Sequence, residues 1–255
     1  MASVERLRIY PVKAFDGTSV EAARITPGGT LEGDRTYALF GPEGEPINGK
    51  RTPRVHELDA DFDPASRALT VTGDGERRTF DLDAEREAAE AWFSAYFGIE
   101  TTIERDTDLG FVDRRSAGPS VISTATIEEV ASWFEALAPE SVRRRLRANV
   151  EIGGVPAFWE DRFVGAGAPP FEAGGIEFEG VTPCGRCVVP ARDPDTGEEI
   201  ERFRERFVER REATFPDFAD REAFDHYFTL MLIASVPEED RSRSLAVGDP
   251  VTVGQ

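Results

Sequence analysis

Apolar and polar residues alternate in short runs along the first hundred positions, which is typical of half-buried β-strands. The clearest run is Val4-Glu-Arg-Leu-Arg-Ile-Tyr-Pro-Val-Lys13, with a period of two. Further strands are predicted at residues 19–25, 36–40, 55–62, 68–72 and 78–82. Turn-forming clusters such as Pro27-Gly-Gly29 and Gly73-Asp-Gly75 separate them. Short strands interrupted this regularly predict a barrel or a sandwich.

The period changes to that of a helix at residues 84–97, and Gly98 stands where a C-terminal cap belongs. Soon afterwards, the segment 106–118 is polar and contains glycines. Such a segment is typical of a connection between structural units. We therefore predict one unit over residues 1–112 and a second over residues 113–255.

The second unit is predicted to contain both kinds of element. A capping box, Thr126-Ile-Glu-Glu129, predicts a helix that runs to about Leu137, and residues 199–211 predict a charged amphipathic helix. Further strands are predicted at residues 120–124, 149–152, 163–164, 175–178 and 244–253. Its core is predicted to include the aromatic residues Trp133, Phe134, Phe158, Trp159 and Phe163. The chain as a whole is predicted to be mixed and β-rich, of the α+β class.

The charge balance of the chain is strongly acidic. Its 255 residues include 49 Asp and Glu against 30 Lys and Arg, a formal net charge of −19, and Lys13 and Lys50 are its only lysines. The acids are spread over the whole chain, which favours adaptation to high salt over recruitment of one basic partner. We expect no nucleic-acid partner, because such binding depends on cationic contacts to phosphate.

The first residues, Met1 to Tyr10, lack the apolar run of a signal peptide. No stretch of the chain reaches the roughly 18 apolar residues of a membrane span. We therefore expect a cytoplasmic protein without a membrane anchor. In that compartment both cysteines are reduced unless their chemistry uses them.

Both cysteines lie in the segment Thr182-Pro-Cys184-Gly-Arg186-Cys187. The positive charge of Arg186 favours the thiolate form, which attacks electrophiles and binds metals. The spacing permits a redox dithiol, half of a zinc site, two core residues, or a single thiolate that binds a metal carried by a cofactor. A zinc site needs four ligands, and the chain adds only His56 and His226, which we interpret as structural. A thioredoxin-like dithiol opens a helix, which Pro190 disfavours here.

Four cations stand near the ends of predicted strands or in the cysteine segment. They are Lys13, Arg35, Arg147 and Arg186. Together they could bind one anion, because arginine forks bind phosphate bidentately and lysine adds a point charge. The alternative is that each pairs with one of the many carboxylates, in surface pairs that contribute about 0–1 kcal/mol each.

Five blocks of sequence, in order, resemble a known family, the MOSC domain with its N-terminal β-barrel domain. Tyr10-Pro-Val-Lys13 and Gly33-Asp34-Arg35-Thr-Tyr-Ala-Leu resemble the N-terminal domain. Three later blocks resemble the MOSC domain itself. The first is Arg147-Ala-Asn149-Val-Glu-Ile-Gly153 with Ala157-Phe-Trp-Glu160-Asp161, and the second is Cys184-Gly-Arg186-Cys187 with Asp193-Pro-Asp-Thr-Gly197. The third is Val247-Gly-Asp249-Pro250-Val251. The resemblance covers nearly the whole chain. It implies an N-terminal β-barrel-like domain followed by a MOSC β-barrel with flanking helices.

The family includes the mitochondrial amidoxime-reducing component and bacterial proteins that detoxify hydroxylaminopurines. The resemblance therefore implies a molybdenum cofactor, in which a pyranopterin dithiolene (molybdopterin) carries the metal. It implies that Cys187 is the catalytic residue and the protein ligand of molybdenum, with Cys184 as a neighbour. The cofactor-binding residues that it implies, besides Cys187, are Lys13, Arg35, Arg147, Asn149 and Arg186.

Three positions depart from the pattern of the related reductases. Ala14 stands where they carry serine beside the lysine, and Lys50 falls about where they have arginine. Their Thr-Ser pair is matched only loosely by Ser116-Ala117-Gly118. These departures concern the substrate pocket rather than the cofactor.

The resemblance implies a molybdenum-dependent oxidoreductase that reduces hydroxylamines, amidoximes or N-hydroxylated bases, with electrons from an external donor protein. An alternative is a module that carries the cofactor, or sulfur on Cys187, without turnover of its own. Some MOSC domains are fused to cysteine desulfurase-like parts that bind pyridoxal phosphate, and this chain has no pyridoxal-phosphate domain. A thiol-only oxidoreductase that uses Cys184 and Cys187 as a dithiol is the third possibility.

Overall fold

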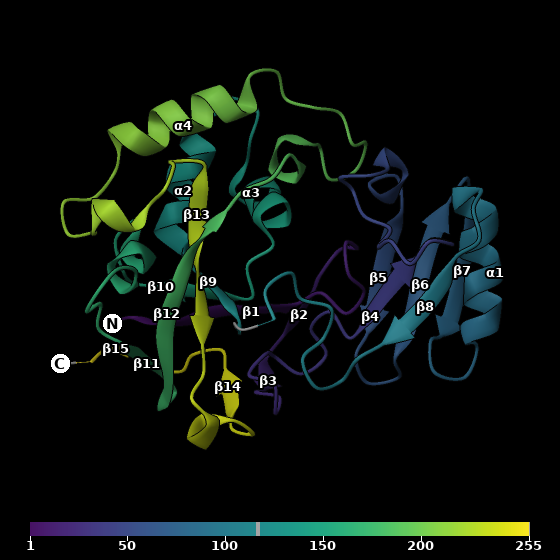
Figure 1. Ribbon diagram of the computed structural model, residues 1–255, viewed down its shortest axis with the longest axis horizontal. Helices are drawn as coiled ribbons and strands as arrows, with labels where there is room; N and C mark the ends of the chain where they lie inside the picture. The colour runs from purple at the N-terminus through teal and green to yellow at the C-terminus, as the bar shows by residue number, and fades with distance from the viewer. Residues whose placement is uncertain (116–117, 255) are drawn as a thin grey trace.

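The largest part of the protein is an eight-stranded sheet that combines strands from both ends of the chain (Figure 1). The structure, a computed structural model, describes residues 1–115 and 118–254. The strands cross the sheet in the order β15 (Val251–Val253), β11 (Phe171–Ala173), β12 (Ile176–Gly185), β13 (Thr229–Ser235), β9 (Ser120–Ser123), β10 (Val150–Gly153), β1 (Ser3–Ile9) and β2 (Thr18–Val20). The start of the chain is thus part of a sheet whose other strands mostly follow residue 118.

Three smaller sheets and four α-helices complete the described fold. The sheets are β5 (Asp59–Asp63) with β6 (Ala68–Gly73) and β7 (Glu76–Asp81), β4 (Tyr37–Phe40) with β8 (Thr102–Arg105), and β3 (Ala22–Arg24) with β14 (Ser244–Ala246). The helices are α1 (Arg86–Phe97), α2 (Thr124–Ser132), α3 (Pro139–Leu146) and α4 (Phe203–Ala213). The predicted mixed, β-rich class is confirmed. The division between residues 112 and 113 stays a prediction.

Strand β1 belongs to the large sheet, and the chain that follows it enters the core of the N-terminal part. Its alternating pattern buries Val4, Leu7 and Ile9 in the core of the large sheet, with a bulge between Val4 and Arg6 that shifts the register. The chain then continues extended, and Val12 lies in the separate core of the N-terminal part. One extended segment therefore joins the two cores.

The parallel pair β9 and β10 requires a crossover, because a tight turn cannot join parallel strands. Helices α2 and α3 form it and cover one side of the sheet (Figure 1). The Ser123 hydroxyl caps α2 by accepting a hydrogen bond from the Thr126 N–H at 3.1 Å. The predicted capping box at Thr126 is therefore wrong, because Thr126 lies inside the helix and donates to Glu160 instead.

Several other element predictions are corrected by the structure. The strand predicted at 55–62 begins only at Asp59, because Pro53 opens a 3-10 turn over Pro53–Val55. Residues 163–164 close another 3-10 turn, Trp159–Phe163, instead of forming a strand. The segments 19–25 and 244–253 each contain two strands that pair with different partners. Residues 116–117, which belong to the loosely matched Thr-Ser position, lie outside the described residues.

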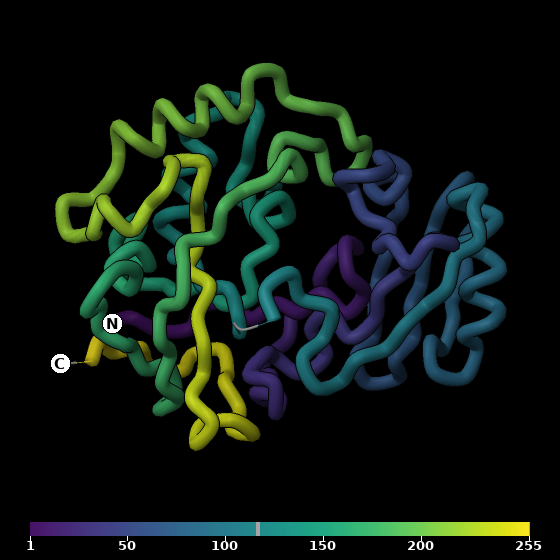
Figure 2. Tube along the Cα trace, viewed as in Figure 1, coloured from purple at the N-terminus to yellow at the C-terminus, as the bar shows by residue number. Residues whose placement is uncertain are grey.

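The two ends of the described chain lie side by side (Figure 2). The Val4 N–H donates to the Asp249 carbonyl at 2.9 Å, and the Val251 N–H donates to the Ala2 carbonyl at 3.0 Å. Helix α1 lies far from them, against the β5–β6–β7 sheet, and ends at Gly98 in the left-handed conformation (φ 71°), as predicted. The five predicted core aromatics of the second unit are all buried.

An ion pair is buried beneath helix α4. The guanidinium of Arg211 on α4 donates to Asp161, and both side chains are almost completely buried. The ring centres of Phe158 and Phe215 lie 4.4 and 5.0 Å from the guanidinium carbon of Arg211. Beside this pair, burial and the Asp161 charge raise the pKa of Glu160 to about 8. The Glu160 carboxyl is therefore protonated in the folded protein at neutral pH.

The raised pKa of Glu160 predicts that the folded protein becomes less stable as pH rises. The ordinary pKa of Glu160 is 4.5, so between this value and about 8 only the folded state keeps the proton, and the free energy of unfolding falls as pH rises. Glu160→Gln imitates the protonated carboxyl. We expect the stability of this variant relative to wild type to rise by about 4 kcal/mol between pH 5 and pH 8.5. Urea denaturation at both pH values measures this difference.

The exposed Glu172→Gln on β11 is the matched control, and its difference from wild type should not change with pH. A difference between Glu160→Gln and wild type that stays flat from pH 5 to pH 8.5 would contradict the raised pKa.

Candidate functional site

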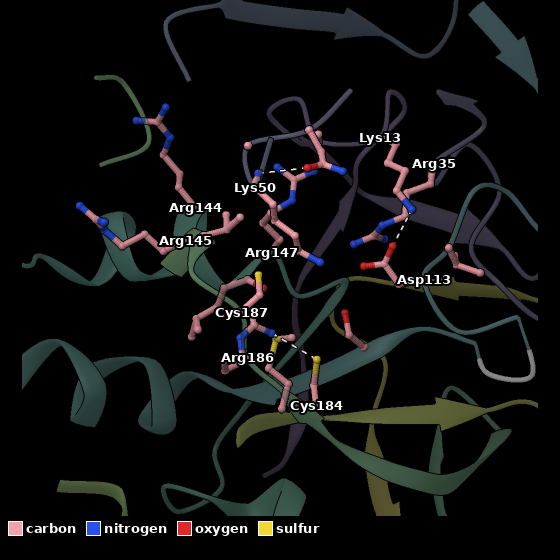
Figure 3. Close-up of a pocket in the computed structure, with 18 of the residues that line it drawn as sticks. Lys13, Arg35, Lys50, Asp113, Arg144, Arg145, Arg147, Cys184, Arg186 and Cys187 are labelled. Carbon is pink, nitrogen blue, oxygen red and sulfur yellow. Dashed lines mark hydrogen bonds and ion pairs between the residues drawn. The ribbon is translucent and has the colours of Figure 1, made fainter. Parts of the chain in front are cut away.

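A cavity of about 610 Å³ lies between the N-terminal loops and the end of β12 with the C-terminus of α3 (Figure 3). The walls of this cavity are mostly cationic, although the chain as a whole is acidic. The cationic side chains that line it are Lys13, Arg35, Lys50, Arg114, Arg144, Arg145, Arg147, Arg186 and Arg192. The acidic ones among the described residues are Asp16 and Asp113. Both lysines and both cysteines of the protein face this one space.

The cavity brings together every residue that the sequence predicts for the site. Lys13, Arg35, Arg147, Asn149, Arg186 and Cys187 all line it. Their assignment as cofactor-binding residues stays a prediction. Sequence reasoning did not select Arg114, Arg144, Arg145 and Arg192. Lys50 carried a signal, since it is one of only two lysines.

Tyr10, which directly follows β1, holds two of these cations. The guanidinium carbons of Arg147 and Arg35 lie 4.2 and 5.1 Å from the centre of its buried ring. The Tyr10 hydroxyl donates to the Ala148 carbonyl at 3.2 Å. Burial raises the pKa of Tyr10 in spite of the opposing charges of both arginines, so the ring stays neutral. A neutral aromatic ring attracts cations without neutralising them, so the charge of Arg147 is left for another anion. Arg35 also pairs with the carboxylate of Asp34.

Both arginines at Tyr10 have a left-handed backbone, which is uncommon for residues other than glycine. Arg35 has φ 50°, and Arg147, at the C-terminal cap of α3, has φ 62° and ψ 43°. Glycine is the usual residue at such a cap. Ala14 (φ 75°) and Met231 (φ 75°) on the cavity wall share this conformation. Strained positions of this kind cluster at functional sites.

The cysteine segment is attached to the end of α3 by Arg186. Its guanidinium donates to the Leu146 carbonyl at 3.0 Å and to Cys184 Sγ at 3.3 Å. Arg114 approaches the same sulfur at 3.7 Å. Both thiols are free and partly exposed, and Cys187 Sγ has no hydrogen-bond partner among residues 1–115 and 118–254. The two cysteines therefore differ, because Cys184 is held by arginines and Cys187 is available.

The side chain of Asn149 is largely occupied by the strands around it. Its Oδ1 accepts from the Ser120 N–H at 3.2 Å and from the Ser120 hydroxyl at 2.9 Å. Its Nδ2 donates to the Arg8 carbonyl at 3.1 Å. Asn149 thus fixes β9, β10 and β1 at the cavity wall, and one amide hydrogen is left for a ligand.

Asp113 and Lys13 form a contact across the cavity mouth. The Lys13 ammonium donates to Asp113 Oδ1 at 2.6 Å and to the Phe111 carbonyl at 2.8 Å. Burial alone would raise the pKa of Asp113, but the hydrogen bond and charge of Lys13, with the charge of Lys50, lower it. The Asp113 carboxylate is therefore ionised and attenuates the charge of Lys13.

Three arginines hold the loop that follows the cysteines. Arg144 pairs with Asp16 at 3.0 Å and with Asp195 at 2.7 Å, so it connects the N-terminal part to this loop. Arg145 is buried and bonds to Asp193 and to the carbonyls of the same loop. Arg192 pairs with Glu199 at 2.8 Å. His56 also faces the cavity, and burial together with the charge of Arg192 lowers its pKa, so it is neutral.

Comparison with known families defines the class of protein to which this fold and cavity belong. The MOSC N-terminal beta barrel domain matches residues 1–138, and the MOSC domain matches residues 114–252. Each match spans more than half of the chain, so the chain belongs to the MOSC-domain family. The resemblance seen in the five blocks of sequence is confirmed.

The chain is similar to named members of this family along most of its length. It is 21% identical over 298 residues to mitochondrial amidoxime reducing component 2 of Bos taurus. The aligned region covers 98% of this chain and 83% of that protein. It is 23% identical over 239 residues to mitochondrial amidoxime-reducing component 1 of Homo sapiens, which covers 77% of this chain and 68% of that protein. In the described part of the present chain, no helix is both long and apolar enough to cross a bilayer.

Inside a helix, an alanine variant is normally more stable than a glycine variant. The left-handed backbone at Arg147 predicts the opposite order at this position. A residue with a Cβ atom costs about 1–2 kcal/mol in this conformation, and glycine avoids that cost. We expect Arg147→Gly to be about 1 kcal/mol more stable than Arg147→Ala in urea denaturation.

Arg143, inside the same helix, is the matched control. There the glycine variant should be less stable than the alanine variant by about 1 kcal/mol. An alanine variant at position 147 as stable as the glycine variant would show that the backbone is not strained.

Proposed function

We propose that the protein is a molybdenum-dependent oxidoreductase that reduces N-hydroxylated compounds, with the cofactor bound in the cationic cavity. One observation carries this proposal. An unoccupied thiol, Cys187, faces the same space as arginines that have no carboxylate partner, in a chain with a large excess of acids. A soft metal attached to an anionic organic group requires this combination of ligands.

The residues present fit such a group. The Arg147 guanidinium donates no hydrogen bond to a described residue, and Arg186 Nε is buried without a partner. A buried donor without an acceptor is costly, and an anionic ligand in the cavity would supply an acceptor for Arg186 Nε. A volume of about 610 Å³ lies within the range of cofactor and ligand sites.

Each residue then has a defined part in holding the cofactor. Cys187 would bind the metal as a thiolate, and Arg35, Arg147, Arg186 and Lys13 would neutralise the phosphate. Asn149 would keep the strands beneath the pocket in place. When bound, the cofactor supplies two-electron redox chemistry for removing oxygen from nitrogen. The Tyr10 ring contacts both guanidiniums, and Asp34 also pairs with Arg35, so these side chains are positioned before the cofactor binds, which reduces the entropy cost of binding.

The overall reaction consumes a hydroxylamine or amidoxime, two electrons and two protons, and releases the amine or amidine and water. The N–O bond breaks, nitrogen is reduced, and an external electron-donor protein is oxidised. The names of the mitochondrial relatives, amidoxime reducing components, support this class of reaction for the present chain.

Removal of the Cys187 thiol provides the first test. We expect the wild-type protein from a cofactor-producing host to contain molybdenum and pterin, measured by elemental mass spectrometry and by fluorescence of the oxidised pterin. Cys187→Ala should lose the metal and all reduction of benzamidoxime, because no other thiol occupies its position. Its circular dichroism should match that of wild type.

Cys184→Ala is the matched control and should retain most of the metal, because Cys184 is assigned as a neighbour. Full metal content in Cys187→Ala would disprove the ligand assignment. Wild type without metal or pterin after incubation with free cofactor would disprove the proposed function. A sulfur-mass adduct on Cys187 in that protein would favour a sulfur carrier instead.

A further inference from the structure

Two cations at the cavity, Lys50 and Arg114, have neither a carboxylate partner among the described residues nor a role in holding the cofactor. We propose that they bind a negatively charged group of the substrate, so that the preferred substrates are N-hydroxylated compounds that carry a carboxylate or a phosphate. This inference rests on the proposed function and specifies its substrate class.

The ion pairs of the cavity separate its cations into two groups. Five of them have a carboxylate within 4.0 Å: Lys13, Arg35, Arg144, Arg145 and Arg192. The other four have no such partner among the described residues: Lys50, Arg114, Arg147 and Arg186. Arg147 and Arg186 are assigned to the cofactor, which leaves Lys50 and Arg114.

Other exposed cations, such as Arg51 and Arg115, also have no carboxylate partner among the described residues. Lys50 and Arg114 differ from them because they face a cavity that gathers nine cationic and two acidic side chains. A cation that faces other cations without a counter-charge raises the energy of the folded state. An anionic ligand at the cavity relieves this repulsion.

Both side chains are placed where a substrate enters rather than where a cofactor is buried. Lys50 and Arg114 are exposed, whereas Arg147 and Arg186 are partly buried. Arg114 nevertheless reaches the cysteine segment, since its guanidinium lies 3.7 Å from Cys184 Sγ. The charge of Lys50 acts on Asp113, which lines the same mouth. Figure 3 shows Lys50 on the side of the cavity opposite Cys184 and Arg186.

The charge of the whole chain makes these two cations more important for an anionic substrate. A net charge of −19 repels anions at a distance, whereas a local cationic mouth raises their concentration at the site. A neutral substrate gains nothing from this arrangement. The preference should therefore depend on charge and weaken with ionic strength.

The test compares matched substrates that differ by one anionic group. The first pair is benzamidoxime and 4-carboxybenzamidoxime, and the second is N4-hydroxycytidine and its 5′-monophosphate. We expect the cofactor-loaded protein to show a higher kcat/KM for the anionic member of at least one pair, and the two pairs distinguish a carboxylate from a phosphate site. In Lys50→Glu/Arg114→Glu, the anionic-to-neutral ratio should fall by about tenfold or more.

The neighbouring Arg51→Glu/Arg115→Glu is the control. Both residues are exposed and do not line the cavity, yet the change in net charge is the same. The ratio in this variant should stay close to that of wild type. An equal fall in both variants would assign the effect to overall charge and overturn the proposal.

A binding measurement keeps this inference separate from the proposed function. Isothermal titration of purified wild type with 4-carboxybenzamidoxime and benzamidoxime should show tighter binding of the carboxylate, and this difference should disappear in Lys50→Glu/Arg114→Glu. If every substrate is turned over but the anionic-to-neutral ratio of kcat/KM is at or below one, the proposed substrate class is wrong and the proposed reductase function still stands. No turnover in loaded protein that binds the carboxylate selectively would disprove the reductase alone. Equal binding of both compounds would overturn the anion site.

Discussion

A single extended segment, residues 3–13, connects the two cores of this protein, and the cavity depends on its position. Its first half is hydrogen-bonded between β10 and β2 in the large sheet. Its second half pairs with the chain at Tyr37, where the Lys13 N–H donates to the Tyr37 carbonyl at 2.8 Å. Because both halves are fixed, Tyr10 and Lys13 have defined places between the two parts. The Arg35 N–H, which donates to the Tyr10 carbonyl at 2.7 Å, is positioned by the same segment.

The electrostatics of the site follow from how its cations are held. Arginines with carboxylate partners, such as Arg144 and Arg145, have a structural role, because they attach the loop after the cysteines to helix α3. Arg147 is held by an aromatic ring and a left-handed cap, which fix its position without removing its charge. Arg144 and Arg145 therefore differ from Arg147 and Arg186, which have no carboxylate within 4.0 Å among the described residues. Lys13 and Arg35 lie between these two groups, because each has a carboxylate partner and also faces the cavity.

The residues that the sequence selects for the site all line one cavity, whereas several of the elements around it were not predicted. Motifs such as Cys184-Gly-Arg186-Cys187 and Gly33-Asp34-Arg35 are local, and both were found from composition and resemblance. Helix α3 was missed because its arginine-rich surface hides the apolar face of Val142 and Leu146. Strand β13 was missed because its residues are apolar without alternation, as expected for a strand buried on both faces. Arg114 could not be selected, because its position beside Cys184 depends on contacts between residues 70 positions apart.

Strand β1 also constrains how the chain reaches its final form during synthesis. Residues 3–9 are synthesised well before their neighbour β10, which begins at residue 150, and before Pro250, to which Ser3 bridges. Until those residues have been made, β1 can pair with β2, but its edge toward β10 stays open. Such an edge is prone to pair with other chains. The dense negative charge of the protein opposes that encounter, so the acidic composition protects the nascent chain during the interval before its sheet can close.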